Sequence, residues 1–146
     1  MDVINDFRGA YRWLSNFHMC EVHHENMVYP STEHAYQAAK TNDLAARLPF
    51  CGHDLSCGEA RRAGQRLVVR RDWNCHRLTV MYSVVVDKFT RHEDLKRMLV
   101  ATGSAQLVEG NTWGDQFWGV CDGKGYNSLG LILMMVRDHL CTQEAR

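Results

Sequence analysis

The chain has 146 residues and is 45% hydrophobic, which is enough for one compact domain with a core of its own. Seventeen Lys and Arg residues balance seventeen Asp and Glu residues, and a chain without net charge lacks the global positive field that would hold long nucleic acid by its phosphates. No linker or low-complexity run divides the sequence, which predicts a single domain over residues 1–146.

Nothing in the sequence indicates a membrane span or a signal peptide. The longest apolar run, residues 131–136, is much shorter than the ~20 residues that a membrane-spanning helix needs. The six cysteines form no CxxC pair, so free thiols of a cytoplasmic protein are expected rather than disulfides. A zinc site built from Cys20, His23 and His24 would need a proximity that their spacing does not supply, and no bound metal is expected.

The N-terminal third contains short strand-like segments separated by turns. Residues 3–4 with Phe7, residues 17–22 and residues 27–29 predict a small N-terminal β-sheet.

The segment from Tyr29 to Lys40 carries the most informative pattern, because its polar groups recur at helical spacing. An acid, a phenol, an amide and an amine stand at i, i+3, i+4 and i+7 and would share one stripe of a helix: Glu33, Tyr36, Gln37 and Lys40. Small residues flank the stripe and would let another element approach closely: Ala35, Ala38 and Ala39. Such a stripe suits the wall of a pocket, and its ends are roughly 10 Å apart, wide enough to bracket a sugar-sized ligand.

Two simpler interpretations of this segment remain open. A carboxylate in the first helical turn interacts favourably with the helix dipole, with Ser31 or Thr32 as N-cap, which would explain Glu33 alone. Alternatively, the polar stripe is a flat, exposed surface with which a structural or interaction protein binds a partner chain.

Two capping boxes predict helix starts farther along the chain. Ser56 with Glu59, and Thr90 with Glu93, each place a hydroxyl three residues before a carboxylate, so that both side chains can satisfy free backbone amides. Two runs of arginine, residues 61–66 and 70–71, are typical of solvated helix faces, although a small phosphate group could use one or two of them.

Two apolar segments predict packed helices. Residues 73–89, with Asp72 as a candidate N-cap, carry apolar side chains such as Leu78 at helical spacing, while their β-branched members leave a strand open for part of the segment. Residues 127–140 are apolar nearly all round, which predicts a central helix whose methionines belong to the core.

Residues 107–120 combine two tryptophans, three glycines and two acids in a loop-like segment. The glycines permit close approach of the backbone to a ligand, and Trp113 and Trp118 offer flat stacking surfaces, so an aromatic ring in the ligand is expected. For any one residue a structural role is at least as plausible, with the tryptophans in the core and Asp115 capping a turn.

The glycine-rich residues 123–130 lead into the last predicted helix. Free backbone amides there could receive a phosphate. The signal is weak, because an Asn127 or Ser128 N-cap explains the segment equally well.

Four blocks of the sequence, in this order, resemble the NADAR family, also called the YbiA-like N-glycosidases. The similarity covers nearly the whole chain and lies in residues 7–17, 29–40, 107–121 and 127–137. Two departures lie mostly away from the motifs: residues 23–26 replace the usual short turn, which would change the pocket rim, and Leu131 stands where many relatives carry a charged residue, which would alter packing or a subunit contact.

The resemblance implies an α+β fold, a mostly helical single domain with a small N-terminal β-sheet, so that residues 1–146 form one NADAR-like N-glycosidase domain. It implies hydrolysis of the C1′–N bond that joins a ribose phosphate or ADP-ribose to a nitrogen base or its exocyclic amine. Known members cleave ribosylamino-pyrimidine phosphates, intermediates of riboflavin synthesis, or remove ADP-ribose from guanine in nucleic acid. The expected partners are therefore a nucleotide-like small molecule or ADP-ribosylated nucleic acid, with no membrane contact and no cofactor.

Cleavage of an N-glycosidic bond develops positive charge on the ribose and negative charge on the departing nitrogen, so the site needs a proton donor and charge stabilisation. In the motifs that resemble the family, Glu33 is expected to be the acid/base or charge-stabilising carboxylate and Asp115 its partner acid. Lys40 either holds a phosphate or forms a Schiff base with the ring-opened sugar aldehyde. The expected substrate-binding residues are Asn16, Phe17, Tyr36, Gln37, Trp113, Gly114, Trp118, Gly119 and Asn127.

A non-catalytic module that binds ADP-ribose or a nucleotide is the alternative to an enzyme. The joint presence of Glu33, Lys40 and Asp115 favours the enzyme, because a binding module needs no acid at the scissile nitrogen.

Overall fold

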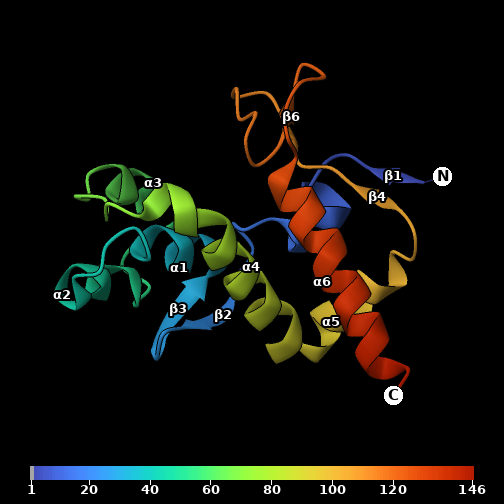
Figure 1. The fold of residues 1–146 in the computed structure, drawn as a ribbon, viewed down its shortest axis with the longest axis horizontal. Helices are drawn as coiled ribbons and strands as arrows, with labels where there is room; N and C mark the ends of the chain where they lie inside the picture. Colours follow the sequence, from blue (N-terminus) through green and yellow to red (C-terminus); the bar gives the residue numbers. More distant parts are fainter. Residues whose placement is uncertain (1) are drawn as a thin grey trace. The chain divides into compact units, whose positions relative to one another are not determined.

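A computed structural model describes residues 2–146, which fall into two compact units (Figure 1). One unit is Asn16–Arg91, and the other combines the described residues up to Ser15 with His92–Arg146. The fold is α+β and mostly helical, with short strands paired two by two, which confirms the predicted fold class. Among the helices of residues 2–146, none combines the length and the apolar character that a membrane crossing requires.

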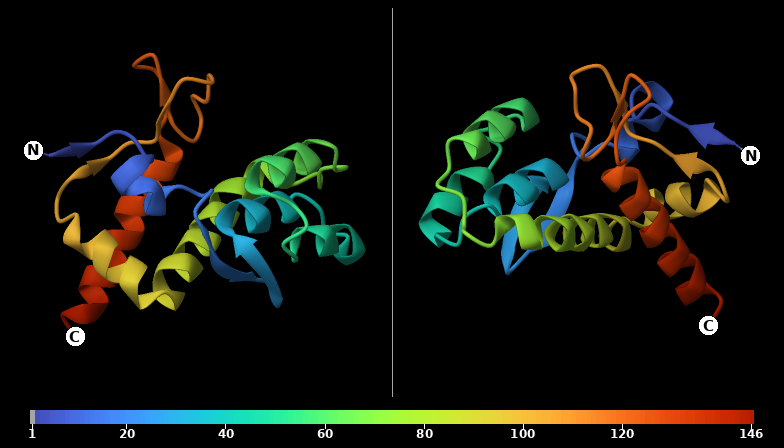
Figure 2. Two further views of the ribbon diagram at one scale, coloured as in Figure 1. Left: turned by 180° about the vertical axis from the view of Figure 1, so that it is seen from behind. Right: turned by 45° about the horizontal axis from the view of Figure 1, so that its top comes forward.

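A β-hairpin opens the unit Asn16–Arg91. Strand β2 (Met19–His24) runs antiparallel to β3 (Met27–Ser31). Glu25 and Asn26 join them with φ of 48° and 65°, the left-handed conformation that a tight type I′ hairpin turn requires at both positions. Figure 2 shows this hairpin in blue, with β2 in contact with helix α4 (Trp73–Arg91).

Helix α1 (Thr32–Ala38) follows β3 directly and lies at the centre of this unit. Of the two candidate N-caps, Ser31 and Thr32, it is Ser31 that caps the helix, and its side chain accepts a hydrogen bond of 3.1 Å from the His34 amide. All of its residues are buried, because α1 packs against α4, against α3 (Cys57–Gln65) and against both strands of the hairpin.

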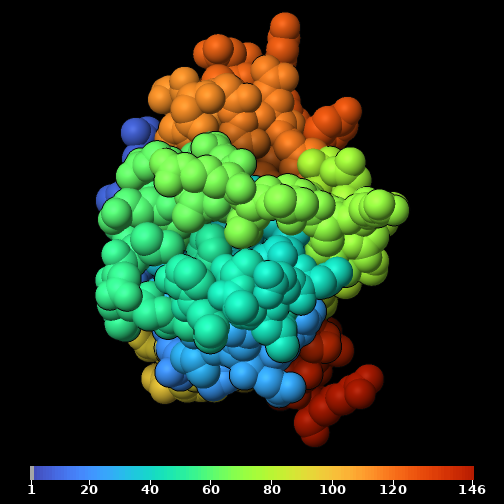
Figure 3. Space-filling model, turned by 90° about the vertical axis from the view of Figure 1, so that its left-hand side faces the viewer, coloured from blue at the N-terminus to red at the C-terminus, as the bar shows by residue number. Residues whose placement is uncertain are grey.

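Two short helices, α2 (Leu44–Arg47) and η2 (Leu48–Phe50), connect α1 to α3. The predicted capping box at the start of α3 is confirmed: the Glu59 amide donates to Ser56 Oγ at 3.1 Å, and the Ser56 amide donates to the Glu59 carboxylate at 3.2 Å. Figure 3 shows the face of this unit that these segments form, in teal and green.

The segment predicted over residues 73–89 is helical throughout, which excludes the strand alternative. Its second half is deeply packed, as expected, and buries Val80, Met81, Val84, Val85 and Phe89. Leu78 was expected to be packed with the other apolar residues of this face of α4, but it is 48% exposed. Among residues 73–79 of α4 only Trp73 is buried, and the other buried residues of the helix lie from Val80 onward.

The second predicted capping box is wrong. Thr90 lies inside α4, where its hydroxyl donates to the Val86 carbonyl at 2.7 Å. This back-bonding to the preceding turn uses the hydroxyl that a capping box needs. Helix α5 (Glu93–Ala101) begins instead after His92, whose side chain makes no capping hydrogen bond.

The other unit contains two pairs of very short parallel strands. β1 (Val3–Ile4) pairs with β4 (Gln106–Leu107), and β5 (Gly110–Asn111) pairs with β6 (Val120–Cys121). The strand at residues 3–4 was expected in the N-terminal sheet, but its partner lies about a hundred residues later in the sequence, and such non-local pairing leaves no local pattern.

Three helical segments complete this unit: η1 (Gly9–Leu14), α5 and α6 (Ser128–Glu144). Helix α6 packs against α5 and β4. The expectation that its apolar residues are buried all round is wrong, because Leu131 and Met135 are 52% and 57% exposed. They lie one turn apart on the side of α6 opposite its buried residues.

Candidate active site

Helix α1 and the turn after it position the four polar residues of the predicted stripe. Glu33, Tyr36 and Gln37 are 8%, 6% and 5% exposed, and Lys40 is half-buried. The stripe is therefore not the flat, exposed surface that the interaction-protein alternative requires.

The predicted helix ends earlier than expected. The last helical residue is Ala38, so Lys40 belongs to the following turn. The reason is a tighter final turn, in which the Lys40 amide donates to the Gln37 carbonyl and the Thr41 amide to the Ala38 carbonyl, at 3.2 and 3.3 Å.

Glu33 is fixed through both its main chain and its side chain. Its amide donates to the Asn16 carbonyl at 3.2 Å, which ties the start of α1 to the segment before the hairpin. The Gln37 side-chain amide, one turn later, donates to Glu33 Oε1 at 2.8 Å. The first turn of a helix favours a carboxylate, so this buried acid sits where the helix itself stabilises its charge.

Lys40 lies against an aromatic pair. Its Nζ is 5.8 Å from the centroid of the Tyr36 ring, and that ring packs on Trp73 at 5.2 Å between centroids. Burial lowers the pKa of the Lys40 amine; Glu33 opposes this shift and Arg61 adds to it. A lysine in these surroundings is easier to deprotonate than a solvated one, which is the property that a nucleophilic amine needs.

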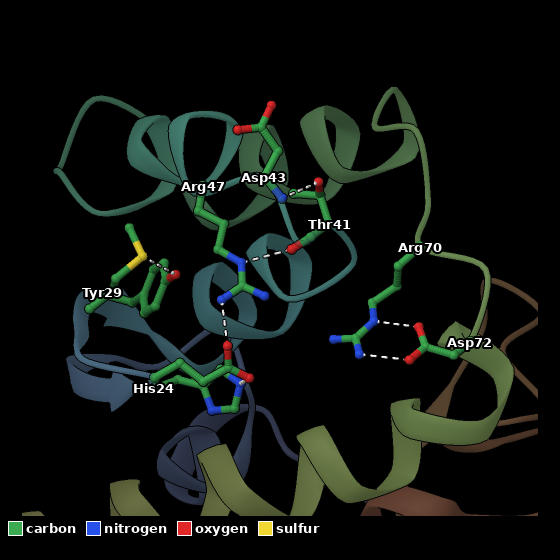
Figure 4. Close-up of polar contacts among 9 residues, drawn as sticks. His24, Tyr29, Thr41, Asp43, Arg47, Arg70 and Asp72 are labelled. Atoms are coloured by element: carbon green, nitrogen blue, oxygen red, sulfur yellow. Dashed lines mark hydrogen bonds and ion pairs between the residues drawn. The ribbon is translucent and has the colours of Figure 1, made fainter.

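The main chain around Lys40 is anchored by two arginines. The Arg70 amide donates to the Lys40 carbonyl at 2.8 Å. Arg47 Nε donates to the Thr41 carbonyl at 2.7 Å (Figure 4). Arg70 is itself held by Asp72 through two hydrogen bonds of 2.6 and 2.8 Å. The main chain at Lys40 and Thr41 is therefore held by residues of α2 and of the segment between α3 and α4.

Arg47 is 1% exposed and also reaches the hairpin turn, where its Nη1 lies 2.8 Å from Glu25 Oε2. The sequence pattern did not single out Arg47, and it indicated Arg70 only as part of an arginine run typical of a solvated helix face.

Asn16 and Phe17, predicted to bind substrate, lie at the start of the same unit. The Asn16 side chain contacts Met81 Sδ at 3.5 Å. The Phe17 carbonyl accepts a contact of 3.4 Å from the Cys57 thiol of α3. The main chain of both residues thus lies within hydrogen-bonding reach of α1 or α3.

The remaining predicted site residues lie in the other unit, in and after the loop between β5 and β6. The Asp115 carboxylate accepts hydrogen bonds from the amides of Phe117 and Trp118, at 3.1 and 2.9 Å. Both polar atoms of the Asn111 side chain hold the Asp115 main chain, at 3.0 and 2.9 Å. Asp115 therefore caps a turn, whatever its further role.

The two tryptophans of this loop differ in their surroundings. Trp113 is 53% exposed, so it does not plug the core. Trp118 is half-buried and meets Phe117 edge-on at 4.8 Å between ring centroids. An exposed indole beside a half-buried one leaves a stacking role open for Trp113.

Gly114 and Gly119, which were predicted to bind substrate, are each also required by the conformation or packing of the loop. Gly114 has a φ of 85°, in the left-handed region that favours glycine. A methyl group on Gly119 would overlap the Glu109 carbonyl and approach the Asn111 side chain to 2.7 Å. The turn around Gly119 is thus too close-packed for a side chain.

The backbone amides at the start of α6 are not free to receive a phosphate, as the sequence had suggested they could be. The amides of residues 127–129 donate to the carbonyls of residues 117–119, at 3.0–3.3 Å. Asn127 binds the chain further, because its Nδ2 donates to the Leu107 carbonyl at 2.9 Å and its Oδ1 accepts from the Glu109 amide at 3.0 Å. This segment therefore joins the Trp118 loop to the start of α6.

The six cysteines are free thiols, as predicted. Over residues 2–146, no group of three or more His, Cys, Asp and Glu side chains is arranged to hold a metal ion.

A protein-family model of the NADAR domain matches residues 5–141, a range that takes in most of both units. The NMR structure of the Escherichia coli protein YbiA is similar to this chain with a TM-score of 0.87 and 31% sequence identity, and the match covers 99% of this chain and 89% of that one.

Curated proteins give the same result. The chain is 37% identical to a riboflavin biosynthesis protein of Vibrio vulnificus over 88% of its own length, but it spans only 35% of that protein. It is 35% identical to an N-glycosidase of Nostoc punctiforme, covering 89% of this chain and 86% of that protein. It is 32% identical to the N-glycosidase YbiA of Escherichia coli, covering 97% and 91%. The chain belongs to the NADAR domain family, and its relatives of similar length are N-glycosidases.

Proposed function

We propose that this N-glycosidase cleaves the C1′–N bond between a phosphorylated ribose and a nitrogen base, with Glu33 and Lys40 as its reacting groups. The observation that carries the proposal is the burial of a carboxylate and the half-burial of an amine on α1 and the turn after it. Removing charged groups from water is costly, so their position calls for a chemical reason.

Glu33 supplies the charge that the reaction demands. As the C1′–N bond breaks, its carboxylate stabilises the positive charge on the ribose or exchanges a proton with the departing nitrogen and the attacking water. The hydrogen bond from Gln37 holds the carboxylate in one orientation, which reduces the reorganisation that catalysis needs.

Lys40 acts in one of two ways. As a cation it binds the phosphate of the substrate. As a neutral amine it attacks C1′ of the ring-opened ribose, which is held as an imine to the base nitrogen, and displaces the base as its free amine; water then hydrolyses the Schiff base on Lys40, releasing the sugar aldehyde and restoring the amine. Its lowered pKa favours the amine. Asp115, Trp113 and Trp118 stay candidates for the partner acid and for stacking on the base.

Two substrate classes fit this proposal. The names of the riboflavin biosynthesis relatives from Vibrio vulnificus and maize favour a ribosylamino-pyrimidine phosphate. The distribution of charge favours ADP-ribosylated guanine in nucleic acid, because residues 61–77 hold six arginines and a single acid, Asp72, in a chain with no net charge.

Parallel assays of the two substrates test the proposal. We expect release of the free base or of ADP-ribose from one of them, with at least a hundredfold preference, and little release by a Glu33→Gln variant. Binding of ADP-ribosyl-guanosine without release of ADP-ribose would instead indicate a non-catalytic binding module. Turnover of neither compound, with a folded protein, would contradict the proposed function.

A further inference from the structure

Helix α3 contains two glycines, Gly58 and Gly64. Glycine destabilises a helix relative to alanine, so a glycine within a helix calls for a packing reason. Gly64 is buried and lies on the side of α3 that packs against α1, together with Cys57 and Ala60.

The missing side chain of Gly64 leaves room for Gln37. A methyl group at this position would overlap Gln37 Oε1 and would approach the Gln37 Cδ to 2.7 Å and its Cβ to 3.0 Å. The same methyl group on Gly58 would meet only the Arg62 guanidinium, at an ordinary contact distance of 3.6 Å. Both glycines lie in the same helix, but only at Gly64 would a methyl group overlap a neighbouring side chain.

The orientation of the Gln37 amide is set at both of its ends. Its nitrogen donates to Glu33 Oε1 at 2.8 Å. Its oxygen is buried against Gly64, and no hydrogen-bond partner of it is found among the described residues. If the Gln37 amide were flipped, its oxygen would face the Glu33 carboxylate and two acceptors would repel each other. The oxygen therefore stays against Gly64, although no donor in the described part of the chain bonds to it there.

We propose that Gly64 is a positioning residue for the carboxylate of Glu33, acting through Gln37. The space at Gly64 holds the Gln37 amide, and the amide holds the carboxylate. This inference rests on the proposed function, in which Glu33 takes part in the chemistry.

Alanine at position 64 is the direct perturbation. The end of the Gln37 side chain is the movable part of the contact, so it rotates away and breaks the hydrogen bond to Glu33. We expect Gly64→Ala to lower kcat by roughly ten- to a hundredfold, because small displacements of a catalytic group have effects of this size, and to change KM by less than about threefold. Gly58→Ala, the matched control, should keep the kcat of the wild-type chain.

A double-mutant cycle separates positioning from a general loss of packing. In a Gln37→Ala background Oε1 and Cδ are gone, and the methyl group at position 64 meets only the Cβ of residue 37, at 3.0 Å. Gly64→Ala should therefore cause little further loss of kcat, and the double variant should regain thermal stability relative to Gly64→Ala. Equal losses of kcat from Gly64→Ala in both backgrounds would overturn the inference.

A measurement without substrate distinguishes failure of this inference from failure of the proposed function. In the wild-type chain, the NMR resonances of the Gln37 side-chain amide should move as Glu33 is titrated, and Glu33→Gln should abolish the movement. Gly64→Ala should abolish it as well, while Gly58→Ala should retain it. An unchanged response in Gly64→Ala would refute the positioning role, whereas a wild-type chain that cleaves no glycoside would refute only the proposed function.

Discussion

The side-chain amide of Gln37 donates a hydrogen bond of 2.8 Å to the carboxylate of Glu33, one turn earlier on α1. Both side chains are buried, so the bond is shielded from competition with water. The Gln37 amide therefore orients the carboxylate that we assign to the chemistry, and a substitution at either residue should lower turnover more than it lowers the stability of the fold.

Glu33→Gln should abolish most of the turnover and preserve the fold. Glutamine keeps an oxygen that can accept the Gln37 hydrogen bond but cannot carry charge or exchange a proton, so we expect kcat to fall by about 10²–10⁴. The free energy of unfolding should change by less than about 1.5 kcal/mol. Steady-state kinetics and thermal unfolding check the two expectations. Near-wild-type kcat in this variant would remove Glu33 from the chemistry.

Lys40→Arg distinguishes the two roles of Lys40. Arginine keeps the positive charge but cannot form an imine, so the variant should lose activity if the Schiff base is on the path and retain much of it if Lys40 only binds phosphate. Given the lowered pKa of the Lys40 amine, we expect loss of turnover. Borohydride reduction during turnover should attach the sugar to the wild-type chain, with the added mass on Lys40. Substantial activity of the variant without any trapped adduct would exclude the covalent route.

How far the sequence predicts this structure depends on the range of the interactions. The Ser56 capping box was predicted correctly and the N-cap of α1 was narrowed to Ser31 or Thr32, because a helix start is encoded within four residues. The anchoring of Thr41 by Arg47 and the contact of Gly64 with Gln37 join residues of different elements. No local pattern announces such contacts, although an isolated glycine in a helical segment is a usable hint.

The candidate residues themselves were found through local spacing, but their surroundings were not. The stripe of α1 showed which side chains share a face, and it could not show that this face is buried. In the other unit, the side chains of Asp115 and Asn127 hold the loop through hydrogen bonds with main-chain atoms. Polar residues in a loop indicate such bonds only in general terms.

The lowered pKa of Lys40 makes a prediction about stability. Burial disfavours its charged form in the folded state, so between that lowered pKa and the ordinary value of 10.5 the unfolded chain binds more protons, and stability rises with pH. Lys40→Met should therefore be more stable than the wild-type chain at pH 7, and this advantage should shrink as the pH approaches 10.5.

Urea unfolding at a series of pH values measures this difference. Lys124→Met is the matched control, because the Lys124 side chain is exposed. A Lys40→Met variant less stable than the wild-type chain at every pH would show that Lys40 is not under a desolvation penalty.

The ion pair of Glu25 with the buried Arg47 makes a second prediction about how the stability of the fold depends on pH. The hydrogen bond from Arg47 lowers the pKa of the Glu25 carboxyl, and burial partly opposes the shift. Its contribution to stability is therefore present above the unfolded value of 4.5 and is lost as the pH falls through the folded pKa. Because the Glu25 side chain is half exposed, we expect Glu25→Gln to cost only about 1 kcal/mol at pH 7.

In chemical unfolding experiments the difference between Glu25→Gln and the wild-type chain should shrink as the pH falls below 4.5 and vanish below the lowered pKa of Glu25. Glu93→Gln serves as the control, since its partner Arg97 lies 3.7 Å away with both side chains exposed, and it should cost nothing measurable. A constant penalty for Glu25→Gln across the whole pH range would mean that the charge of Glu25 does not contribute.

Asp115→Asn tests whether the acid of the Trp118 loop has a role beyond its turn. Asparagine keeps the oxygen that accepts hydrogen bonds from the amides of Phe117 and Trp118, so the turn should persist while the charge is lost. If Asp115 is a partner acid, kcat should fall by about 10²-fold or more with KM little changed. Asp115→Ala, which removes the cap as well, should additionally lower the melting temperature. Wild-type turnover in Asp115→Asn together with destabilisation in Asp115→Ala would confine this residue to holding the loop, and the search for the second acid would then turn to Glu109, whose amide is held by Asn127 at 3.0 Å.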